Sequence, residues 1–410
     1  MSLFLLYSCD SSTDPPPEEK PPGYQEDVPW PSLADSPWPM YRCDPQGTGR
    51  TNYLINLTGT INWKIDSFYV ASGAAITEDS TILIGTNDIF SPNYAEGGLI
   101  ALKSDGNIKW KFSFKNYAKG ISSPVIANDG TIYISSTHER KFYAINPDGS
   151  KKWELYIDAM IIQSGICIGK DGTLFALGWK GDFFDLLAIS PNGELLWTLS
   201  DERFSGETLN GMSLSPDGKT LYIPGGHDGP AVFAVDIENH EIIWEFGEER
   251  ATISAIPIVD SDGNVYIFAK NNQNQGLLYS LNLAGEIRWE YILDDPWSFV
   301  SSFNLFALSK DGDIILGHDK LYCINYQGEL KWKVQLEKTI ASPITIDNSG
   351  NCYFVVEENN VADLLMVDNS GNILQSIPLE SNDFSWYSPT ITDFGILLNS
   401  YNSKQIVFIR

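Results

Sequence analysis

The chain has 410 residues and a net charge of −26, from 27 basic and 53 acidic side chains. An acidic surface of this kind repels phosphate backbones, because nucleic-acid binding depends on Lys and Arg side chains that release condensed counterions. The charge therefore argues against nucleic acid as a partner. Hydrophobic residues make up 43% of the chain, and an aromatic content of 12% favours β-strands. No run reaches the roughly 18 apolar residues that suggest a membrane-spanning helix.

The first residues predict attachment to a membrane through a lipid. The segment Leu6-Tyr7-Ser8-Cys9 resembles a bacterial lipobox, with Leu three positions before Cys and a small residue directly before it. The resemblance implies that residues 1–8 are the remnant of a signal peptide and that Cys9 takes a diacylglycerol and becomes the mature N-terminus. Several acyl chains would attach it firmly, since each buried CH₂ contributes about 0.8 kcal/mol. We therefore expect a bacterial cell-envelope location, on the outer membrane, facing the periplasm or the cell surface.

Only eight residues precede Cys9 and none of them is basic, whereas a secretory signal normally has a charged segment and an apolar core of roughly 7–15 residues. We therefore expect the true start to lie upstream of Met1. Residues 9–37 contain Pro15-Pro16-Pro17 and are too polar to bury a core. They are predicted to form a semi-rigid, extended tether between the lipid and a globular body at 38–410.

A pattern repeated along the chain predicts the fold. An apolar strand with a small residue, a polar turn that usually contains Gly, and a strand with Trp follow one another, as in 99–110 and 142–153. The last position of this pattern recurs at intervals of 43 to 47 residues, and the eighth copy ends in Gln375. In the other seven copies the position is occupied by Trp63, Trp110, Trp153, Trp197, Trp244, Trp289 and Trp332.

A second motif lies between these copies and consists of two apolar strands joined by an Asp-Gly turn, as in 123–134 and 256–267. Such pairs are hairpins, so each unit holds four antiparallel strands, A to D, as a propeller blade does. The last unit has strands at 388–399 and 405–409, and the half-copy at 59–65 supplies the strand that it lacks. The prediction is an all-β, eight-bladed β-propeller, in which an N-terminal strand completes the C-terminal blade and removes an exposed edge.

The repeat, with Ala in strand C and Trp in strand D, resembles the tryptophan-docking repeat of the PQQ-like (pyrroloquinoline-quinone-type) β-propellers. Residues 38–50 resemble the segment that often precedes such propellers, so the resemblance covers about 38–410. It implies that the seven Trp side chains dock between neighbouring blades, and that the strand with Gln375 is fastened less well. The family includes quinoprotein dehydrogenases and pure scaffolds. One scaffold is a lipid-anchored, eight-bladed lipoprotein of the outer-membrane β-barrel assembly machinery, to which this chain is similar in length, lipobox and blade number.

Catalytic chemistry finds little support among the side chains. The quinoprotein enzymes of the family clamp their cofactor with an adjacent Cys pair, whereas the five cysteines of this chain stand apart. By their place in the repeat, His138, His227 and His318 fall in blades two, four and six, too far apart to share one zinc ion. We therefore predict no cofactor, no metal site and no catalytic residue. A quinone-dependent dehydrogenase and a lyase-like hydrolase are the alternatives in which the chain is an enzyme.

The connections between strands point to one face. A–B and C–D turns are short, whereas B–C and D–A connections are longer and all emerge on the opposite face, called here the loop-rich face; the other is the turn face. Loops on a rigid scaffold commonly carry function, and aromatic side chains with a polar surround are typical of binding surfaces. The aromatic residues of these connections are Phe90, Tyr94, Trp179, Phe183, Phe184, Phe204, Trp297, Phe299, Trp386 and Tyr387.

These residues predict a protein-interaction scaffold that binds an envelope protein or peptide on the loop-rich face. The alternative use of the same aromatic residues is to pack the loops onto the blades. A second functional hypothesis is a glycan or another small ligand in the central funnel of the propeller.

Overall fold

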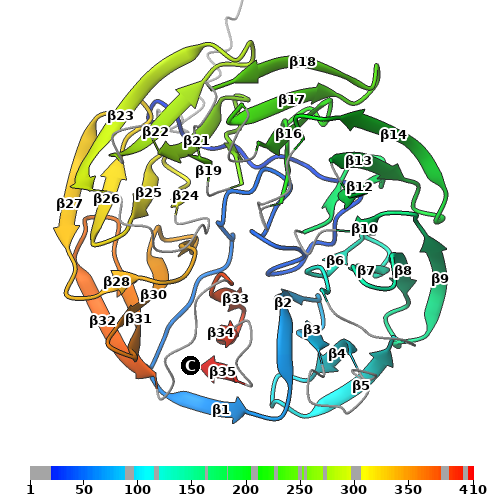
Figure 1. Cartoon of the computed structure of the whole chain (residues 1–410). Helices are drawn as coiled ribbons and strands as arrows, with labels where there is room; N and C mark the ends of the chain where they lie inside the picture. The colour runs from blue at the N-terminus through cyan, green and yellow to red at the C-terminus, as the bar shows by residue number, and fades with distance from the viewer. Residues whose placement is uncertain are drawn as a thin grey trace, which may run out of the picture.

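The computed structural model describes residues 20–87, 97–114, 120–161, 165–181, 183–204, 211–225, 230–247, 252–253, 256–270, 275–296, 306–379, 387–399 and 405–410. These residues form eight antiparallel sheets arranged as blades around a central axis, and all of their regular elements are strands (Figure 1). The predicted eight-bladed β-propeller is confirmed. No helix in this part of the chain is long and apolar enough to cross a bilayer.

Strand A lies nearest the axis and strand D at the rim (Figure 1). Blades one to four, from strand A to strand D, are β2 (Tyr69–Ile76), β3 (Ile82–Asn87), β4 (Gly98–Leu102), β5 (Ile108–Ser113); β6 (Val125–Ile126), β7 (Ile132–Ser136), β8 (Lys141–Ile145), β9 (Lys151–Tyr156); β10 (Met160–Ile161) and β11 (Cys167–Ile168), β12 (Leu174–Trp179), β13 (Phe184–Ile189), β14 (Leu195–Asp201); and β15 (Ser213–Leu214), β16 (Thr220–Pro224), β17 (Val232–Asp236), β18 (Glu241–Phe246).

In blades three, five and seven, strand A is divided into two short pieces that both pair with strand B. Blades five to eight, in the same order, are β19 (Thr252–Ile253) and β20 (Ile258–Val259), β21 (Val265–Lys270), β22 (Gln275–Leu281), β23 (Ile287–Pro296); β24 (Phe306–Leu308), β25 (Ile314–Gly317), β26 (Lys320–Ile324), β27 (Leu330–Gln335); β28 (Thr339–Ile340) and β29 (Thr345–Ile346), β30 (Cys352–Glu358), β31 (Val361–Val367), β32 (Ile373–Leu379); and β33 (Thr390–Thr392), β34 (Gly395–Asn399), β35 (Ile406–Ile409), β1 (Ile61–Ile65).

The ring closes as the repeat predicts. Strand β1 pairs antiparallel with β35, and Trp63 lies opposite Phe408 in that pair. The N-terminal strand therefore becomes the outer strand of blade eight. The hydrophobic core is divided among the spaces between blades, where buried side chains of neighbouring strands B and C meet.

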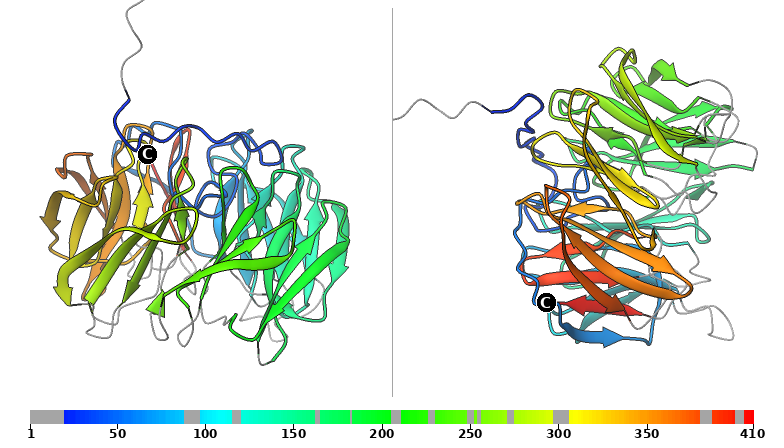
Figure 2. Two further views of the ribbon diagram at one scale, coloured as in Figure 1. Left: turned by 90° about the horizontal axis from the view of Figure 1, so that it is seen from above. Right: turned by 90° about the vertical axis from the view of Figure 1, so that its left-hand side faces the viewer.

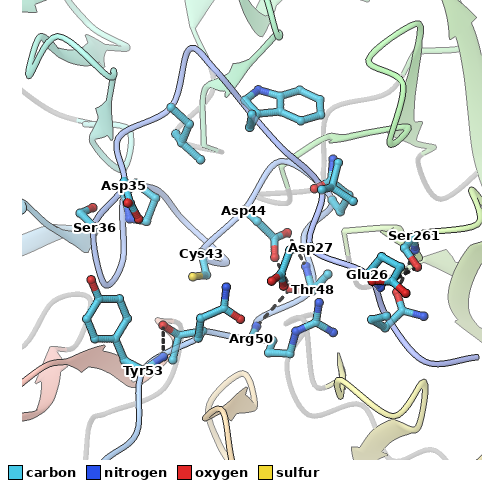
Figure 3. Close-up of a pocket in the computed structure, with 18 of the residues that line it drawn as sticks. Glu26, Asp27, Asp35, Ser36, Cys43, Asp44, Thr48, Arg50, Tyr53 and Ser261 are labelled. Carbon is cyan, nitrogen blue, oxygen red and sulfur yellow. Dashed lines mark hydrogen bonds between the residues drawn. The ribbon is translucent and has the colours of Figure 1, made fainter. Parts of the chain in front are cut away.

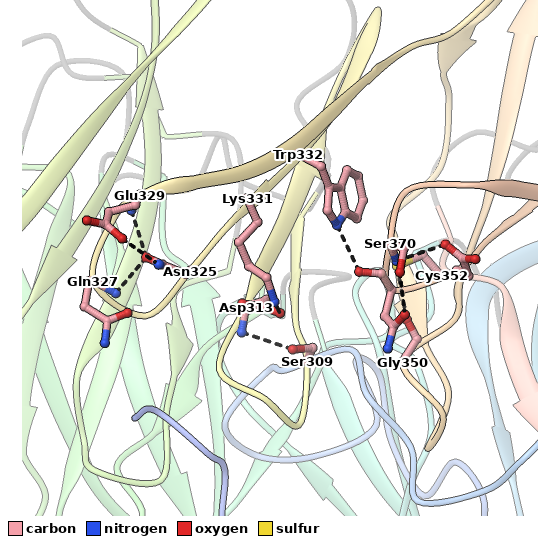
Figure 4. Close-up of polar contacts among 12 residues, drawn as sticks. Ser309, Asp313, Asn325, Gln327, Glu329, Lys331, Trp332, Gly350, Cys352 and Ser370 are labelled. Atoms are coloured by element: carbon pink, nitrogen blue, oxygen red, sulfur yellow. Dashed lines mark hydrogen bonds and ion pairs between the residues drawn. The ribbon is translucent and has the colours of Figure 1, made fainter. Parts of the chain in front are cut away.

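The tryptophans of strand D lie across the gap to the next blade. In six of the seven, the indole Nε1–H group donates to a backbone oxygen in the next blade's C–D turn, as Trp332 does to Asn369 at 2.9 Å (Figure 4). The turn then places a Gly under the ring; at Gly149, whose φ is +86°, an added Cβ would lie 2.7 Å from Trp110. Trp197 is the exception, because His240 replaces this Gly and its ring stacks on the indole at 4.4 Å.

Residues 20–60, called here the turn-face segment, run across the turn face (Figure 2). From Trp38 to Gly49 the segment offers its backbone oxygens to the A strands of six blades, namely one, two, four, five, six and seven. The six donors are the backbone N–H groups of Ile76, Ile126, Leu214, Val259, Leu308 and Ile346, at 2.7 to 3.0 Å. This segment therefore joins the inner strands around most of the ring.

The described part of the expected tether is packed on the propeller. The Trp30 indole donates to the Ile168 oxygen at 2.8 Å, Ser32 donates to Gly169, and the side chains of Gln25 and Ser32 are buried. Residue 38 therefore does not separate a packed region from an unpacked one. Residues 1–19, with Cys9, lie outside the described part of the chain.

Candidate binding sites on the two faces

On the loop-rich face, the β12–β13 hairpin of blade three presents an exposed aromatic residue. Trp179 ends β12, lies opposite Phe184 in β13 and is 37% exposed. Lys180 in the same hairpin forms an ion pair with Asp185 at 2.6 Å, and the fully buried Asp185 accepts a hydrogen bond from Ser200. The hairpin is therefore held by a buried carboxylate while its indole faces solvent.

The other aromatic residues predicted for this face divide into three groups. Phe183 and Phe184 are half-buried beside Trp179, and Tyr387 is half-buried against the core shared by blades seven, eight and one. Phe204 is a correction: it is 2% exposed and packs edge-on against Phe233 at 5.1 Å, so it belongs to the core and cannot anchor a partner. Outside the described residues lie Phe90, Tyr94, Trp297, Phe299 and Trp386.

The described cysteines are buried structural residues. Burial raises the pKa of the Cys167 thiol to about 12 and raises those of Cys43, Cys323 and Cys352 above their usual value. A thiol reacts as the thiolate, so these four are poor nucleophiles at neutral pH. The described residues contain no group of three or more His, Cys, Asp and Glu side chains that could hold a metal ion.

At the centre of the ring, the turn-face segment inserts a buried arginine that sequence reasoning missed. Arg42 is 1% exposed and donates to the backbone oxygens of Ile344, at 2.8 Å, and Phe306, at 2.5 Å, in blades seven and six. Burial lowers the pKa of this guanidinium. Gly49 must be Gly, because its φ is +69° and an added Cβ would lie 2.3 Å from the Arg42 guanidinium. The close spacing of Gly47 and Gly49 after Arg42 was the available signal.

Two passes of the turn-face segment enclose a polar cavity of about 330 Å³ above Arg42, which is called here the central plug. Figure 3 shows Asp27, Asp44 and Thr48 on one side of the cavity and Asp35 and Tyr53 on the other. Asp44 accepts hydrogen bonds from the backbone N–H and the hydroxyl of Thr48, and burial raises its pKa. The bonds from Thr48 close a turn, and the Thr48 hydroxyl oxygen also accepts the backbone N–H of Arg50 at 3.2 Å.

A second cavity, of about 410 Å³, lies on the turn face between blades one and two. Its walls include Leu83, Trp110, Ile132 and Pro147, and Asp35 and Lys109 are among its polar lining residues. Its lining is thus more apolar than that of the cavity above Arg42. Neither cavity was anticipated from the sequence, which predicted function on the opposite face.

Comparison with known proteins places the chain among propellers. A stretch of 154 residues, 37% of this chain, is 28% identical to lambda-carrageenases of Pseudoalteromonas sp. and Pseudoalteromonas carrageenovora, and it spans only 16% of their length. Similar solved structures, which show the fold alone, are the Dos1 propeller (TM-score 0.62, 10% identity, 85% of this chain and 95% of that one), Saccharomyces cerevisiae Sqt1 (0.61, 10%, 88% and 98%) and the C-terminal WD40 domain of Sif2 (0.58, 12%, 86% and 98%).

A family match covers the start of the ring. Residues 50–178 match the family described as outer membrane protein assembly factor BamB. The match begins where the turn-face segment leaves the centre of the ring, and it runs through blades one and two into strand B of blade three. Together with the eight-bladed architecture, this match supports a PQQ-like β-propeller that is similar to BamB.

Proposed function

We propose that this protein is a non-catalytic scaffold of the bacterial cell envelope, anchored by a lipid on Cys9, that holds a protein partner on its loop-rich face. The similarity to BamB, an assembly factor by its description, supports a role in protein–protein interaction. The observation that carries the proposal is the place where the chain reaches the propeller. Gln25 donates its backbone N–H to Lys310 in the A–B turn of blade six, on the turn face.

This attachment supports the loop-rich face as the one left free for a partner. Lys20 follows Cys9 by eleven residues, and eleven extended residues span at most about 40 Å. A lipid on Cys9 would therefore keep the turn face within that distance of the membrane. The loop-rich face would then point away from the bilayer, with Trp179 of blade three accessible to a partner.

Photo-crosslinking from intact cells tests the proposal. A photoreactive amino acid at Glu202, an exposed residue next to the β12–β13 hairpin on the loop-rich face, is expected to give one discrete crosslinked protein. The same amino acid at Glu286, an exposed residue of the blade-five C–D turn, is the matched control and should give none. Replacing Trp179, Trp297 and Trp386 together by Ala should abolish capture without unfolding the protein. Equal products from both faces, or an unchanged profile of the triple variant, would rule the proposal out.

Glycan binding is a second candidate, supported by the 28% identity to lambda-carrageenases over 154 residues. A propeller that binds a glycan should be stabilised by it, because a ligand that binds only the folded state raises the free energy of unfolding. A thermal-shift panel of neutral and acidic oligosaccharides, with quinone plus calcium as a separate arm, discriminates the candidates. A shift with one oligosaccharide class would favour this candidate, and a shift with quinone plus calcium would favour the dehydrogenase alternative.

A further inference from the structure

One position of strand B fills the space beneath the docked tryptophan in four of the eight blades. The ring at this position lies close to the Trp of the same blade in four cases: Tyr133–Trp153 at 5.8 Å, Phe175–Trp197 at 6.0 Å, Tyr222–Trp244 at 5.7 Å and Tyr266–Trp289 at 5.9 Å. In blade one the corresponding row across strands B, C and D is Leu83, Ala101 and Trp110. Blade one therefore has no aromatic ring where these four blades have one.

The turn-face segment supplies a second filler at one junction but not at the next. Between blades two and three, the bulky Trp30 donates its indole N–H to the Ile168 oxygen. Between blades one and two, the equivalent oxygen of Ile126 accepts the backbone N–H of Ala34, at 3.0 Å. Leu83 is smaller than the aromatic residue of the other four blades, and Ala34 is smaller than Trp30, so the cavity of about 410 Å³ remains at this junction. We call it the blade 1–2 pocket.

The adjacent junction shows what such a space accommodates. The Pro191 oxygen accepts the Trp153 indole N–H at 2.9 Å and the Tyr133 hydroxyl at 3.4 Å. At the blade 1–2 junction, the corresponding Pro147 oxygen accepts the Trp110 indole N–H at 3.0 Å. Leu83 replaces the phenol donor of Tyr133 and has no hydroxyl. A carbonyl with two lone pairs can accept a second hydrogen bond, so Pro147 offers an acceptor to a phenol from outside.

The rim of the pocket is acidic. Asp79 forms an ion pair with Lys109 at 2.8 Å, whereas the exposed carboxylates Asp35 and Glu78 add negative charge beside it. Opposite charge at a rim chiefly favours association rate and specificity. Basic residues on both sides of an inserted side chain would therefore complement this rim.

We infer that the blade 1–2 pocket binds the side chain of a tyrosine flanked by basic residues in a partner polypeptide, with the phenol stacked near Trp110 and bonded to the Pro147 oxygen. The pocket volume lies within the ~300–1,000 Å³ typical of ligand sites. The inserted ring would take the place that Tyr133 occupies in the next blade. This site lies on the turn face and does not depend on the proposed use of the loop-rich face.

Calorimetric titration of the full chain tests the inference with three peptides. The probes are acetyl-Lys-Tyr-Lys-amide, acetyl-Lys-Leu-Lys-amide and acetyl-Glu-Tyr-Glu-amide. The first is expected to bind, and the other two at least tenfold more weakly, because each lacks either the phenol or the basic flanks. Free p-cresol is the fourth probe. Binding of p-cresol as tight as that of the first peptide would overturn the role of the flanking residues.

Variants that fill the pocket provide the decisive comparison. Leu83→Tyr supplies the missing phenol from the chain itself, and Ala34→Trp supplies the missing indole of the turn-face segment; each should reduce peptide binding at least tenfold. Ile315→Tyr, at the same strand-B position in blade six, is the matched control and should leave binding unchanged. The inference is overturned if the parent protein does not bind the first peptide, or if a folded Leu83→Tyr variant binds it as the parent does.

Discussion

The indole of Trp63 stacks on the ring of Phe408, with centroids 5.2 Å apart and planes at 15°. Its Nε1–H group also donates to the Ser104 oxygen in blade one at 2.9 Å. One side chain near the start of the chain therefore fastens the outer strand of blade eight to its own sheet and to the following blade. Both ends of the ring depend on this residue.

Trp63→Ala should destabilise the protein by about 2 kcal/mol, somewhat less than the ~3–5 kcal/mol of fully buried aromatic deletions, because Trp63 is only half-buried. The variant loses both the stack on Phe408 and the bond to blade one. Urea unfolding followed by circular dichroism measures the change. Trp63→Phe, which keeps the stack and loses the hydrogen bond, should lie between the parent and Trp63→Ala. Equal stability of the parent and Trp63→Ala would show that Trp63 does not fasten the outer strand of blade eight.

Blade seven shows what the missing tryptophan costs and how to restore it. Gln375 lies opposite Met366 in strand C of blade seven. In blades one to six the Trp at this position lies opposite a residue smaller than Met, as in blades one and two, where it is Ala. The side-chain oxygen of Gln375 is buried without a hydrogen-bond partner. Gly59, with φ +76°, lies against Gln375 as the turn glycines lie against Trp elsewhere. The junction between blades seven and eight thus keeps the glycine turn and lacks the Trp and the small residue opposite it.

Gln375→Trp alone should be neutral or destabilising, because Met366 occupies the space that Ala leaves for the indole in other blades. In the Met366→Ala background the same substitution should stabilise the protein by about 1 kcal/mol, since neighbouring sites couple non-additively. Thermal unfolding of the four proteins of this cycle measures the coupling. Additive changes would show that the two positions do not share the docking space.

Much of the fold could be predicted from the sequence because each blade repeats the same local chemistry. The spacing of the Trp positions and the strand fragment around Trp63 were sufficient for blade number and closure. The turn-face segment could not be predicted, because its role depends on backbone oxygens, such as those of Trp38 and Gly49, that meet A strands distant in sequence. A Pro-rich, polar composition indicates an unpacked chain only where no exposed strand edge is available to pair with it.

The candidate site was less predictable for a related reason. Aromatic residues in connections identify Trp179 and Phe204 equally well, and only the packing of Phe204 on Phe233 separates a surface residue from a core residue. The blade 1–2 pocket is a difference between repeats. It becomes visible when Leu83 is compared with Tyr133 in the aligned strands, once the structure shows that both face the docked Trp.

The turn carboxylates should govern the response to acid. Burial opposes ionisation of Asp129, but hydrogen bonds from Thr131 and Lys152 outweigh it, so the pKa of Asp129 is below its usual value. A carboxyl with a lowered folded-state pKa contributes stability at pH values above its unfolded pKa, and this contribution is lost as pH falls through its folded-state pKa. Asp129→Asn should therefore destabilise the protein at pH 7 by less than about 1 kcal/mol, since the pair is largely exposed.

The difference in stability between the parent and Asp129→Asn should shrink when urea unfolding is repeated near pH 3. At that pH Asp129 of the parent is largely protonated in the unfolded state and begins to be protonated in the folded state. Lys152→Met should show the same trend with a smaller difference at pH 7, since the bonds from Thr131 remain. A difference that stays constant between the two pH values would mean that the carboxylate charge does not carry the effect.

The buried guanidinium of Arg42 is expected to be the most sensitive side chain of the turn-face segment. Arg42→Met leaves the oxygens of Ile344 and Phe306 without their donor, and each unsatisfied buried group costs about 1–3 kcal/mol. Arg42→Lys keeps a buried charge but cannot reach both oxygens in the same planar geometry. We expect both variants to be destabilised by about 2–4 kcal/mol, and Lys to be no better than Met because a buried charge is costly to desolvate. Arg140→Met, which removes an exposed ion pair with Asp158, is the control and should change stability by less than about 1 kcal/mol. If Arg42→Met unfolds at the same urea concentration as the parent, the central plug does not hold the blades together.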